Sequence, residues 1–255
     1  MATVSTRKFA VVTGASSGIG FELALQCVRN GYDVLISAEN DAINDAAEKL
    51  KVSGAMVYEL KEDLSKPEGV ERLYQRIIDI GRNVDALLLN AGVGVGGAFL
   101  ETSLEDELSM IAINCGHTVH LAKRVISDMV ANQSGRVLIT GSALSDEPSP
   151  YQAVYGATKA FVYSFGQALR EELLGSGVTV TLLQPGATDT EFFVRAGLLD
   201  TGLKDSASQV AKEGFEGMIA GEPYVVAGSQ LGEVEEQINE AMLPKEPTPH
   251  HRGRH

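Results

Sequence analysis

The sequence predicts one α/β domain in which a doubly wound parallel sheet of about seven strands is flanked by helices. Short apolar runs rich in Val, Ile and Leu alternate with longer amphipathic segments along the chain. The short runs lack the apolar–polar alternation of a half-solvated strand, and strands covered on both faces are typical of parallel sheets. Repeated alternation of strand and helix indicates right-handed βαβ units.

The expected elements follow the chain in this alternating order. The expected strands are residues 9–13, 33–37, 55–60, 86–90, 136–140, 178–184 and 224–227, and the expected helices are residues 18–30, 42–51, 69–81, 104–131, 152–175 and 208–220. No linker rich in Pro or Ser divides the chain, so we interpret residues 1–243 as one domain. Residues 188–205 show no clean helical period and are expected to form a substrate loop.

The last residues, 244–255, are rich in Pro, Lys, Arg and His and are expected to form a disordered tail. Metal binding by His250 and His251 is the weaker alternative, because nothing in the sequence fixes their geometry. No metal site is expected elsewhere.

Composition and charge exclude several classes of function. A formal net charge of −13 opposes binding to a phosphate backbone, and Lys and Arg form no cluster, so nucleic acid is not an expected partner. No apolar run approaches transmembrane length, and residues 1–9 lack the apolar stretch of a signal peptide, so no membrane association is expected. Cys27 and Cys115 are interpreted as small buried thiols. We therefore expect a cytoplasmic protein.

A glycine-rich turn, Thr13-Gly14-Ala15-Ser16-Ser17-Gly18-Ile19-Gly20, lies between the first expected strand and the first expected helix. Glycine permits a tight turn and lets the backbone approach a pyrophosphate without an intervening Cβ. The free amides at the start of the helix then favour the negative charge. A purely structural turn is the alternative interpretation, and the position between strand and helix favours phosphate binding.

Tyr155 and Lys159 are four positions apart, so on a helix both side chains project from one face. A free phenol titrates near pH ~10, which is too high for an acid/base at neutral pH. Lowering that pKa by about two to three units needs roughly 3–4 kcal/mol, and a cation about 4 Å away supplies up to about 4 kcal/mol at an intermediate dielectric. The spacing therefore predicts that Lys159 lowers the pKa of Tyr155.

The pair alone is more typical of an amphipathic tyrosine beside a solvated lysine. Ser142 favours the catalytic interpretation, because it lies 13 positions before Tyr155 and just after the expected strand 136–140. In open α/β sheets, ligands bind outside the carboxyl ends of the strands, which is where Ser142 is expected.

The glycine-rich turn, Asn90-Ala91-Gly92, Asn114, Ser142, the Tyr155/Lys159 pair and Pro185-Gly186 occur in an order that resembles the short-chain dehydrogenases/reductases, a family with a Rossmann-type sheet. The resemblance covers residues 8–227. It implies hydride transfer between NAD or NADP and a carbonyl compound or alcohol, with Tyr155 as the acid/base.

The resemblance also implies a role for each of the other catalytic candidates. Ser142 would bond the substrate oxygen. Lys159 would lower the pKa of Tyr155 and bond the nicotinamide ribose, and Asn114 would keep a helix locally open and hold a water molecule in a proton relay.

Further residues are implied to bind the cofactor. The full set is Gly14, Ser16, Ser17, Gly18, Ile19, Gly20, Glu39, Asp63, Leu64, Asn90, Ala91, Gly92, Tyr155, Lys159, Pro185, Gly186, Thr188 and Thr190. Asp63 resembles the family's adenine-binding acid, and the segment from Pro185 to Thr190 resembles the one that closes over the nicotinamide. The sequence departs from the family at Leu89, where Asn is more usual, and at Gly141, where a second Ser is common.

The choice between NAD and NADP depends on the residues after the second expected strand. Family members that use NADP often have Arg where Glu39 stands, and those that use NAD often have Asp where Ala38 stands. Glu39 would repel a 2′-phosphate and could accept a hydrogen bond from a ribose hydroxyl. Arg7 and Lys8 are not placed to compensate. NAD is therefore favoured over NADP.

The substrate is expected to be a small, mainly apolar carbonyl compound or alcohol, because the candidate lining at residues 94–99, 144–151 and 192–199 mixes glycine with aliphatic and aromatic residues. Apolar positions on more than one face of the helices 104–131 and 152–175 indicate a homodimer or homotetramer, with burial against the sheet as the alternative.

Two other functions stay open at this point. One is a catalytically idle dinucleotide-binding protein that acts in redox sensing or as a scaffold, and the other is an isomerase or epimerase on the same fold.

Overall fold

A computed structural model describes residues 7–51, 54–145, 148, 150–190, 196 and 205–228. The strands are β1 Lys8–Thr13, β2 Tyr32–Ala38, β3 Val57–Lys61, β4 Ala86–Leu89, β5 Gly135–Thr140, β6 Val178–Pro185, β7 Thr188–Asp189, β8 Asp205–Ser206 and β9 Tyr224–Ala227. The helices are α1 Gly18–Arg29, α2 Ala42–Lys51, α3 Pro67–Ile80, α4 Leu104–Ile111, α5 His117–Ala131, α6 Ala153–Glu172 and α8 Ala207–Ala220.

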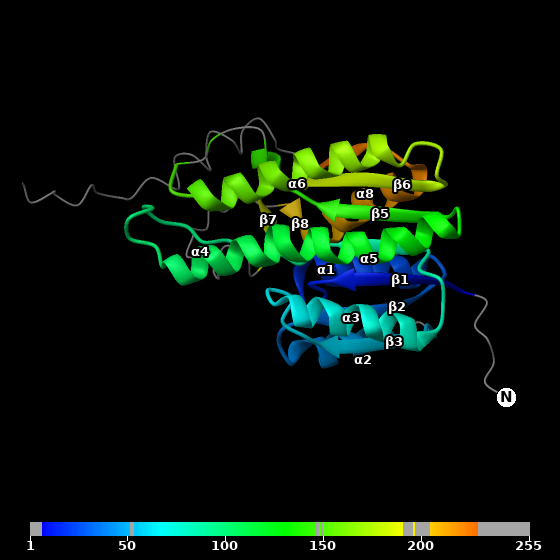
Figure 1. Ribbon diagram of the computed structural model, residues 1–255. Coiled ribbons are helices and arrows are strands. Elements are labelled where there is room, and N and C mark those ends of the chain that lie inside the picture. Colours follow the sequence, from blue (N-terminus) through cyan, green and yellow to red (C-terminus); the bar gives the residue numbers. More distant parts are fainter. Residues whose placement is uncertain are drawn as a thin grey trace, which may run out of the picture.

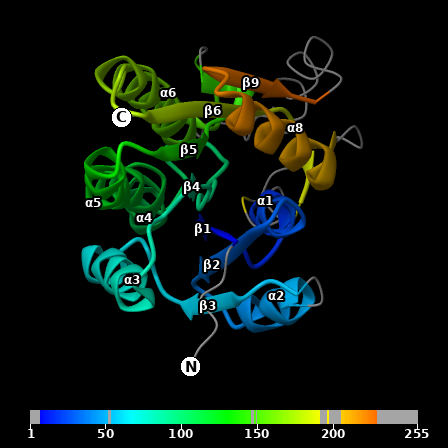
Figure 2. The ribbon, with the colours of Figure 1, turned by 90° about the vertical axis from the view of Figure 1, so that its right-hand side faces the viewer.

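Seven of the strands form one parallel sheet in the order β3-β2-β1-β4-β5-β6-β9, and β7 and β8 form a separate parallel pair (Figure 1). Helices α1, α2 and α8 cover one face, while α3, α5 and α6 cover the other (Figure 2). This architecture confirms the predicted fold class. Within the described ranges, no helix combines the length and the apolarity needed to cross a membrane.

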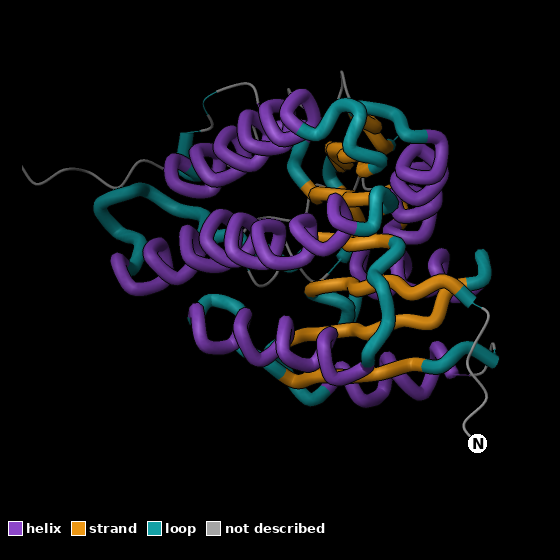
Figure 3. The backbone as a smooth tube through the Cα atoms, turned by 45° about the vertical axis from the view of Figure 1, so that its right-hand side comes forward, coloured by secondary structure: helices purple, strands orange, loops and turns teal. Residues whose placement is uncertain are grey.

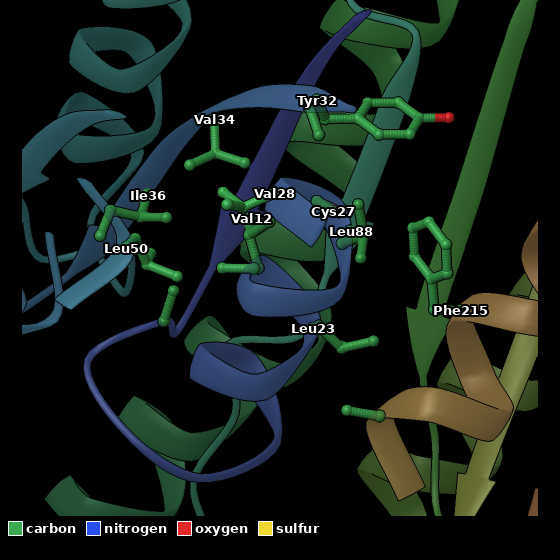
Figure 4. Close-up of a cluster of buried hydrophobic side chains, with 14 of the residues drawn as sticks. Val12, Leu23, Cys27, Val28, Tyr32, Val34, Ile36, Leu50, Leu88 and Phe215 are labelled. Atoms are coloured by element: carbon green, nitrogen blue, oxygen red, sulfur yellow. The ribbon is translucent and has the colours of Figure 1, made fainter. Parts of the chain in front are cut away.

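Each face of the sheet has its own apolar core, because successive residues of a strand point to opposite sides. Val11 belongs to the core under α3, α5 and α6, whereas its neighbour Val12 belongs to the core under α1, α2 and α8. In the second core the rings of Tyr32 and Phe215 meet edge to face with centroids 6.2 Å apart, and Leu23 of α1 lies nearby (Figure 4). Burial on both faces explains why the strands read as continuous apolar runs.

The structure differs from the expected elements mainly in the segment 104–131. The single helix predicted there is present as α4 and α5, joined by a π-helical turn at Ala112–Gly116. Helix α3 begins at Pro67 rather than residue 69, because proline suits the first turn, where its missing N–H is not needed. Cys27 is buried as predicted, whereas Cys115, in the π turn, is only half-buried.

Two predicted segments lie largely or wholly outside the described residues. These are the tail 244–255, with His250 and His251, and the substrate loop 188–205 apart from residues 188–190, 196 and 205. Helix α4 and the loop before it extend beyond the carboxyl ends of the strands (Figures 1 and 3).

Candidate active site

The sheet has its topological switch point between β1 and β4. These neighbouring strands are parallel, but β1 continues into α1 on one face and β4 leads toward α4 and α5 on the other (Figure 2). Ligands of open α/β sheets bind outside the carboxyl ends of the strands at such a point. All predicted site residues except Asn114, Tyr155 and Lys159 follow the end of a strand or overlap it, as the sequence order implies.

The turn between β1 and α1 is held tightly against the end of β4. Gly14 has a φ of 68°, and a Cβ on it would lie 2.7 Å from Cα of Ala91. A Cβ on Gly20 would lie 2.1 Å from the carbonyl oxygen of Gly14. The side chain of Ser17, the residue before α1, makes no capping hydrogen bond to the helix. The first-turn amides of α1 therefore stay available for an anionic group.

The side chains of Thr13 and Asn90 join the ends of three strands. The backbone amides of Asn90 and Ala91 donate to Thr13 Oγ1 at 3.1 Å and 3.0 Å. Nδ2 of Asn90 donates to the carbonyl oxygens of Thr13 and Gly14 at 3.2 Å and 3.3 Å. Asn90 Oδ1 accepts from the Thr140 hydroxyl of β5 at 3.1 Å. Asn90 therefore fixes the distances between β1, β4 and β5.

Asn114 lies buried in the π turn and bonds the segment that leaves β4. Its Oδ1 accepts from Val93 N at 2.9 Å, and its Nδ2 donates to Val93 O at 3.0 Å and to Thr158 Oγ1 at 2.9 Å. A Cβ on Gly92 would lie 3.2 Å from Asn114 Oδ1 and 3.6 Å from Lys159 Nζ. The structure thus brings together Gly92, Asn114 and Lys159. The π turn that carries Asn114 fits this placement, because π turns within helices are frequently found at functional sites.

Ser142, Tyr155 and Lys159 meet at the carboxyl end of β5. The Ser142 hydroxyl is hydrogen-bonded to the Tyr155 phenol. Nζ of Lys159 lies 5.8 Å from the centre of the Tyr155 ring and donates to the carbonyl oxygen of Thr140 at 3.1 Å. All three residues are buried: the exposed fraction is 8% for Ser142, 8% for Tyr155 and 6% for Lys159. The three groups that the sequence singles out therefore lie close together.

The pKa of Tyr155 is shifted in the opposite direction to the one that the sequence predicts. Burial raises the pKa of Tyr155 to about 12, and the hydrogen bond with Ser142 only partly opposes this. Burial lowers the pKa of Lys159 to about 8, while Cys115 raises it slightly. Loss of water disfavours the charged form of each group. In this state the phenol keeps its proton at neutral pH.

The remaining predicted residues surround this centre. Asp63 accepts hydrogen bonds from the hydroxyl and the amide of Ser65, which lower its pKa against the effect of burial, and it also pairs with Lys66 at 2.9 Å. The Leu64 side chain is buried in the core under α3. Glu39 is exposed after β2 and accepts from Asn40 Nδ2 at 3.2 Å.

The segment after β6 approaches the start of α1. Thr188 is buried, and its hydroxyl donates to the carbonyl oxygen of Gly186 at 3.0 Å. The methyl group of Thr190 lies 3.0 Å from where a Cβ on Gly18 would be. The segment that follows Pro185 thus faces the glycine-rich turn across the switch point.

Sequence reasoning missed one buried polar residue of this region, His117. Its Nδ1 lies 2.7 Å from the carbonyl oxygen of Ile113 and its Nε2 lies 3.2 Å from Thr13 Oγ1. Burial lowers its pKa to about 4, and the nearby charge of Lys159 adds to this. The available signal was its place three residues after Asn114, on the same side of a helix.

Comparison with known proteins identifies the family. The family model described as short chain dehydrogenase matches residues 8–197, which is most of the chain. The chain belongs to this family. An uncharacterised short-chain type dehydrogenase/reductase of Sinorhizobium fredii is 35% identical over 72% of this chain and 71% of its own length. An uncharacterised oxidoreductase of Staphylococcus epidermidis is 30% identical over 72% of this chain and 79% of its own length.

Solved structures of the family share the fold. A short-chain dehydrogenase from Sphingobium yanoikuyae in complex with NADPH superposes with a TM-score of 0.79 at 30% identity, covering 86% of this chain and 87% of that protein. An alcohol dehydrogenase from the archaeon Thermococcus sibiricus, complexed with 5-hydroxy-NADP, gives a TM-score of 0.77 at 26% identity, covering 86% and 95%.

The contact between Gly14 and Ala91 predicts an unequal effect of two glycine substitutions. Gly14→Ala places a residue with a Cβ at a φ of 68° and also 2.7 Å from Cα of Ala91, whereas Gly81→Ala meets a φ of 70° with nothing within 4 Å. The left-handed backbone costs about 1–2 kcal/mol in either variant. We expect urea unfolding to show a loss of about this size for Gly81→Ala, and a loss larger by about 1–3 kcal/mol for Gly14→Ala. Equal losses would contradict the tight approach of β4.

Proposed function

We propose that the protein is an NAD(P)-dependent oxidoreductase that transfers a hydride between a nicotinamide ring and a carbonyl compound or secondary alcohol, with Tyr155 as the acid/base. The observation that carries this proposal is the meeting of Ser142, Tyr155 and Lys159 at the edge of the sheet that also carries the glycine-rich turn. Family membership supports the same reaction class.

The residues at the switch point fit a dinucleotide. Gly14 and Gly20 stand where a Cβ would collide with the backbone, so the turn is shaped to stay free of side chains. The first-turn amides of α1 supply positive potential for a pyrophosphate despite the net charge of −13. We assign the adenosine half to the side of Glu39 and Asp63, and the nicotinamide half to the side of Lys159 and Thr188.

The chemistry of the hydride belongs to the nicotinamide when it is bound. In the reductive direction, the Tyr155 phenol gives its proton to the carbonyl oxygen as that oxygen gains the electron pair of the C=O bond, and the product is an alcohol. The phenol is protonated at neutral pH in this structure, which is the form that a general acid needs before the transfer. Ser142 donates a hydrogen bond to the same oxygen. Lys159 bonds the ribose and stabilises the phenolate once it forms.

Asn114 acts in this proposal by holding the π turn open. Its side chain is occupied by Val93 and Thr158, so it orders the segment after β4 and the face of α6 that carries Tyr155. The water molecule of a proton relay would then lie beside the π turn, as the family resemblance implies.

NAD is the favoured cofactor, on an argument from charge. Glu39 lies after β2, where a 2′-phosphate would have to be accommodated. Arg7 does not compensate, since it pairs with Asp33 at 3.3 Å near the amino end of β2, whereas Glu39 follows the carboxyl end. Lys61, at the end of β3, is paired with Asp41 at 2.7 Å. The solved relatives named above are complexed with NADPH and 5-hydroxy-NADP, so on this charge argument the chain differs from them.

The cofactor preference predicts the effect of Glu39→Arg. We expect the unmodified protein to bind NAD more tightly than NADP, and Glu39→Arg to shift the ratio of the two dissociation constants toward NADP by about tenfold or more, through charge-assisted hydrogen bonds to the phosphate. Isothermal titration calorimetry measures both constants. Glu222→Arg makes the same charge change just before β9, the edge strand on the far side of the sheet from β2 and β3, and should leave the ratio unchanged. Tighter binding of NADP by the unmodified protein would overturn the preference.

The acid/base assignment predicts the effect of removing one hydroxyl. Tyr155→Phe should lower kcat by about 100-fold or more while the dissociation constant of the dinucleotide changes little. Turnover is followed by absorbance of the reduced cofactor over a panel of ketones and secondary alcohols. Tyr163→Phe removes the hydroxyl of another α6 tyrosine, which accepts from Gln167 at 3.0 Å, and should retain the rate. A Tyr155→Phe enzyme with most of its activity would disprove the assignment.

The same assay separates the alternatives. Dinucleotide binding without turnover on any substrate would favour the idle redox-sensing or scaffold protein. Conversion of an alcohol to its isomer or epimer without net change of the cofactor would favour an isomerase or epimerase. The buried and mutually bonded Ser142 and Tyr155 favour the oxidoreductase, because this arrangement serves proton transfer to a substrate oxygen.

We further propose that the substrate is small and mainly apolar. The loop after β4 is rich in glycine, and two of its backbone amides donate to residues much later in the chain. Gly96 N donates to Ala196 O at 3.0 Å, and Gly97 N donates to Tyr151 O at 2.8 Å. These bonds occupy two backbone amides of the loop, which are then not free to bind a charged substrate. Most of the predicted lining at 144–151 and 192–199 lies outside the described residues. The cytoplasm stays a prediction from the sequence.

The protein is also proposed to form a homodimer or homotetramer through α4 and α6, which lie against each other. Leu104 is 73% exposed, Leu108 56% and Phe161 44%, so these apolar side chains are not buried against the sheet. A second copy of the chain would cover them.

This assembly predicts that charges on α4 dissociate the oligomer. The double variant Leu104→Glu, Leu108→Glu should be monomeric by analytical ultracentrifugation at a concentration where the unmodified protein is a dimer or tetramer. Leu174→Glu makes the same change at a residue that is 66% exposed beyond the end of α6, and should not alter the mass. A monomeric unmodified protein, or a double variant that stays assembled, would refute this interface.

A further inference from the structure

His117 is a buried titratable residue that the reaction does not use, and its two ring nitrogens connect two parts of the site. The residue is 1% exposed at the start of α5. Nδ1 faces the carbonyl oxygen of Ile113, within the helical segment that contains Asn114, at 2.7 Å. Nε2 faces the hydroxyl of Thr13, the last residue of β1, at 3.2 Å. The imidazole thus spans from the π-helical segment to the strand end.

Hydrogen-bond accounting fixes the protonation of the ring. The carbonyl oxygen of Ile113 can only accept, so Nδ1 carries the proton. The Thr118 hydroxyl, 3.5 Å from Nδ1, already donates to the carbonyl oxygen of Asn114 at 2.8 Å and does not compete for this position. Nε2 of a neutral ring then has a free lone pair that faces Thr13.

The Thr13 hydroxyl needs that lone pair. Its oxygen has two lone pairs, and both receive backbone amides, from Asn90 at 3.1 Å and Ala91 at 3.0 Å. Its single proton must therefore point to another acceptor. Among the residues that the structure describes, the acceptors in reach are His117 Nε2 at 3.2 Å and the carbonyl oxygen of Leu88 at 3.5 Å. The shorter bond to His117 turns the oxygen so that its lone pairs face the two amides.

We propose that His117 is a positioning residue of the dinucleotide site, which as a neutral imidazole orients the Thr13 hydroxyl and thereby fixes Asn90 and Ala91 against the glycine-rich turn. The placement of Ala91 has little tolerance, because its Cα lies 2.7 Å from where a Cβ on Gly14 would be. A protonated ring would aim a third donor at an oxygen that already accepts two, and the low pKa of His117, about 4, is consistent with the neutral form. The inference rests on the proposed dinucleotide-binding function.

Two substitutions separate the two bonds of the ring. In His117→Asn the carboxamide lies near the position of Nδ1, and Asn30 and Asn132 already donate in this way to the carbonyl four residues earlier, each at 2.8 Å. This variant is expected to keep the bond to Ile113 and lose the bond to Thr13. In His117→Gln the longer side chain reaches the position of Nε2, where its carbonyl oxygen can accept from Thr13. Both variants lose the ring, so they share its packing loss.

The experiment measures dissociation constants of NAD and NADP by calorimetry for the unmodified protein and both variants, with urea unfolding in parallel. We expect His117→Asn to weaken the tighter-bound dinucleotide by about five- to tenfold, the effect of one lost hydrogen bond, while His117→Gln stays within about twofold of the unmodified protein. A purely structural role for the ring would lower the stability of both variants without separating their dissociation constants.

Thr13→Val provides a second arm, because it removes the hydroxyl at nearly constant volume. It should weaken the dinucleotide at least as much as His117→Asn, and adding His117→Asn to it should produce no further weakening. Equal dissociation constants for the Asn and Gln variants would overturn the role of His117 while the unmodified protein still binds dinucleotide. If both His117 variants fail to fold, unchanged binding by Thr13→Val overturns it instead. Failure of the unmodified protein to bind either dinucleotide would refute the proposed function itself.

Discussion

The ends of β1 and β4 carry backbone polar groups that have no strand partner, because the chain leaves these neighbouring strands toward opposite faces of the sheet. Buried amides and carbonyls left without partners are costly, and the side chains of Thr13 and Asn90 provide them. This local requirement fixes the distance between the glycine-rich turn and Ala91. Gly92 follows Ala91 directly, and Asn114 and Lys159 both lie close to Gly92.

Burial has opposite consequences in the two halves of the site. Around Tyr155 and Lys159 it removes water and favours the uncharged forms, so the phenol holds its proton at neutral pH. At the start of α1, where residues 16–19 are half-buried, partial exclusion of water strengthens the attraction of backbone amides for an anion. An acidic chain can therefore offer an anionic cofactor a favourable site, because the potential there comes from the backbone and not from basic side chains.

The segment from α4 to α5 links the proposed interface to the site. Exposed leucines lie on α4, and the π turn that follows places Asn114 and His117 inside the molecule. One widened turn reorients the helix so that one part faces solvent and the next faces the strand ends. A second copy packed on α4 would thus rest on the same element that orders the segment after β4, which connects assembly to the geometry of the site.

The sequence alone determined the fold class, the order of the strands along the chain and the identity of Ser142, Tyr155 and Lys159 as a group, because these follow from local periodicity and from spacings that a helix or strand end converts into proximity. The tertiary structure decided the rest. The pKa of Tyr155 depends on how completely water is excluded where the end of β5 meets α6, and the role of His117 depends on a strand end 104 positions away in the chain. Such effects arise from packing between distant segments, which no local pattern encodes.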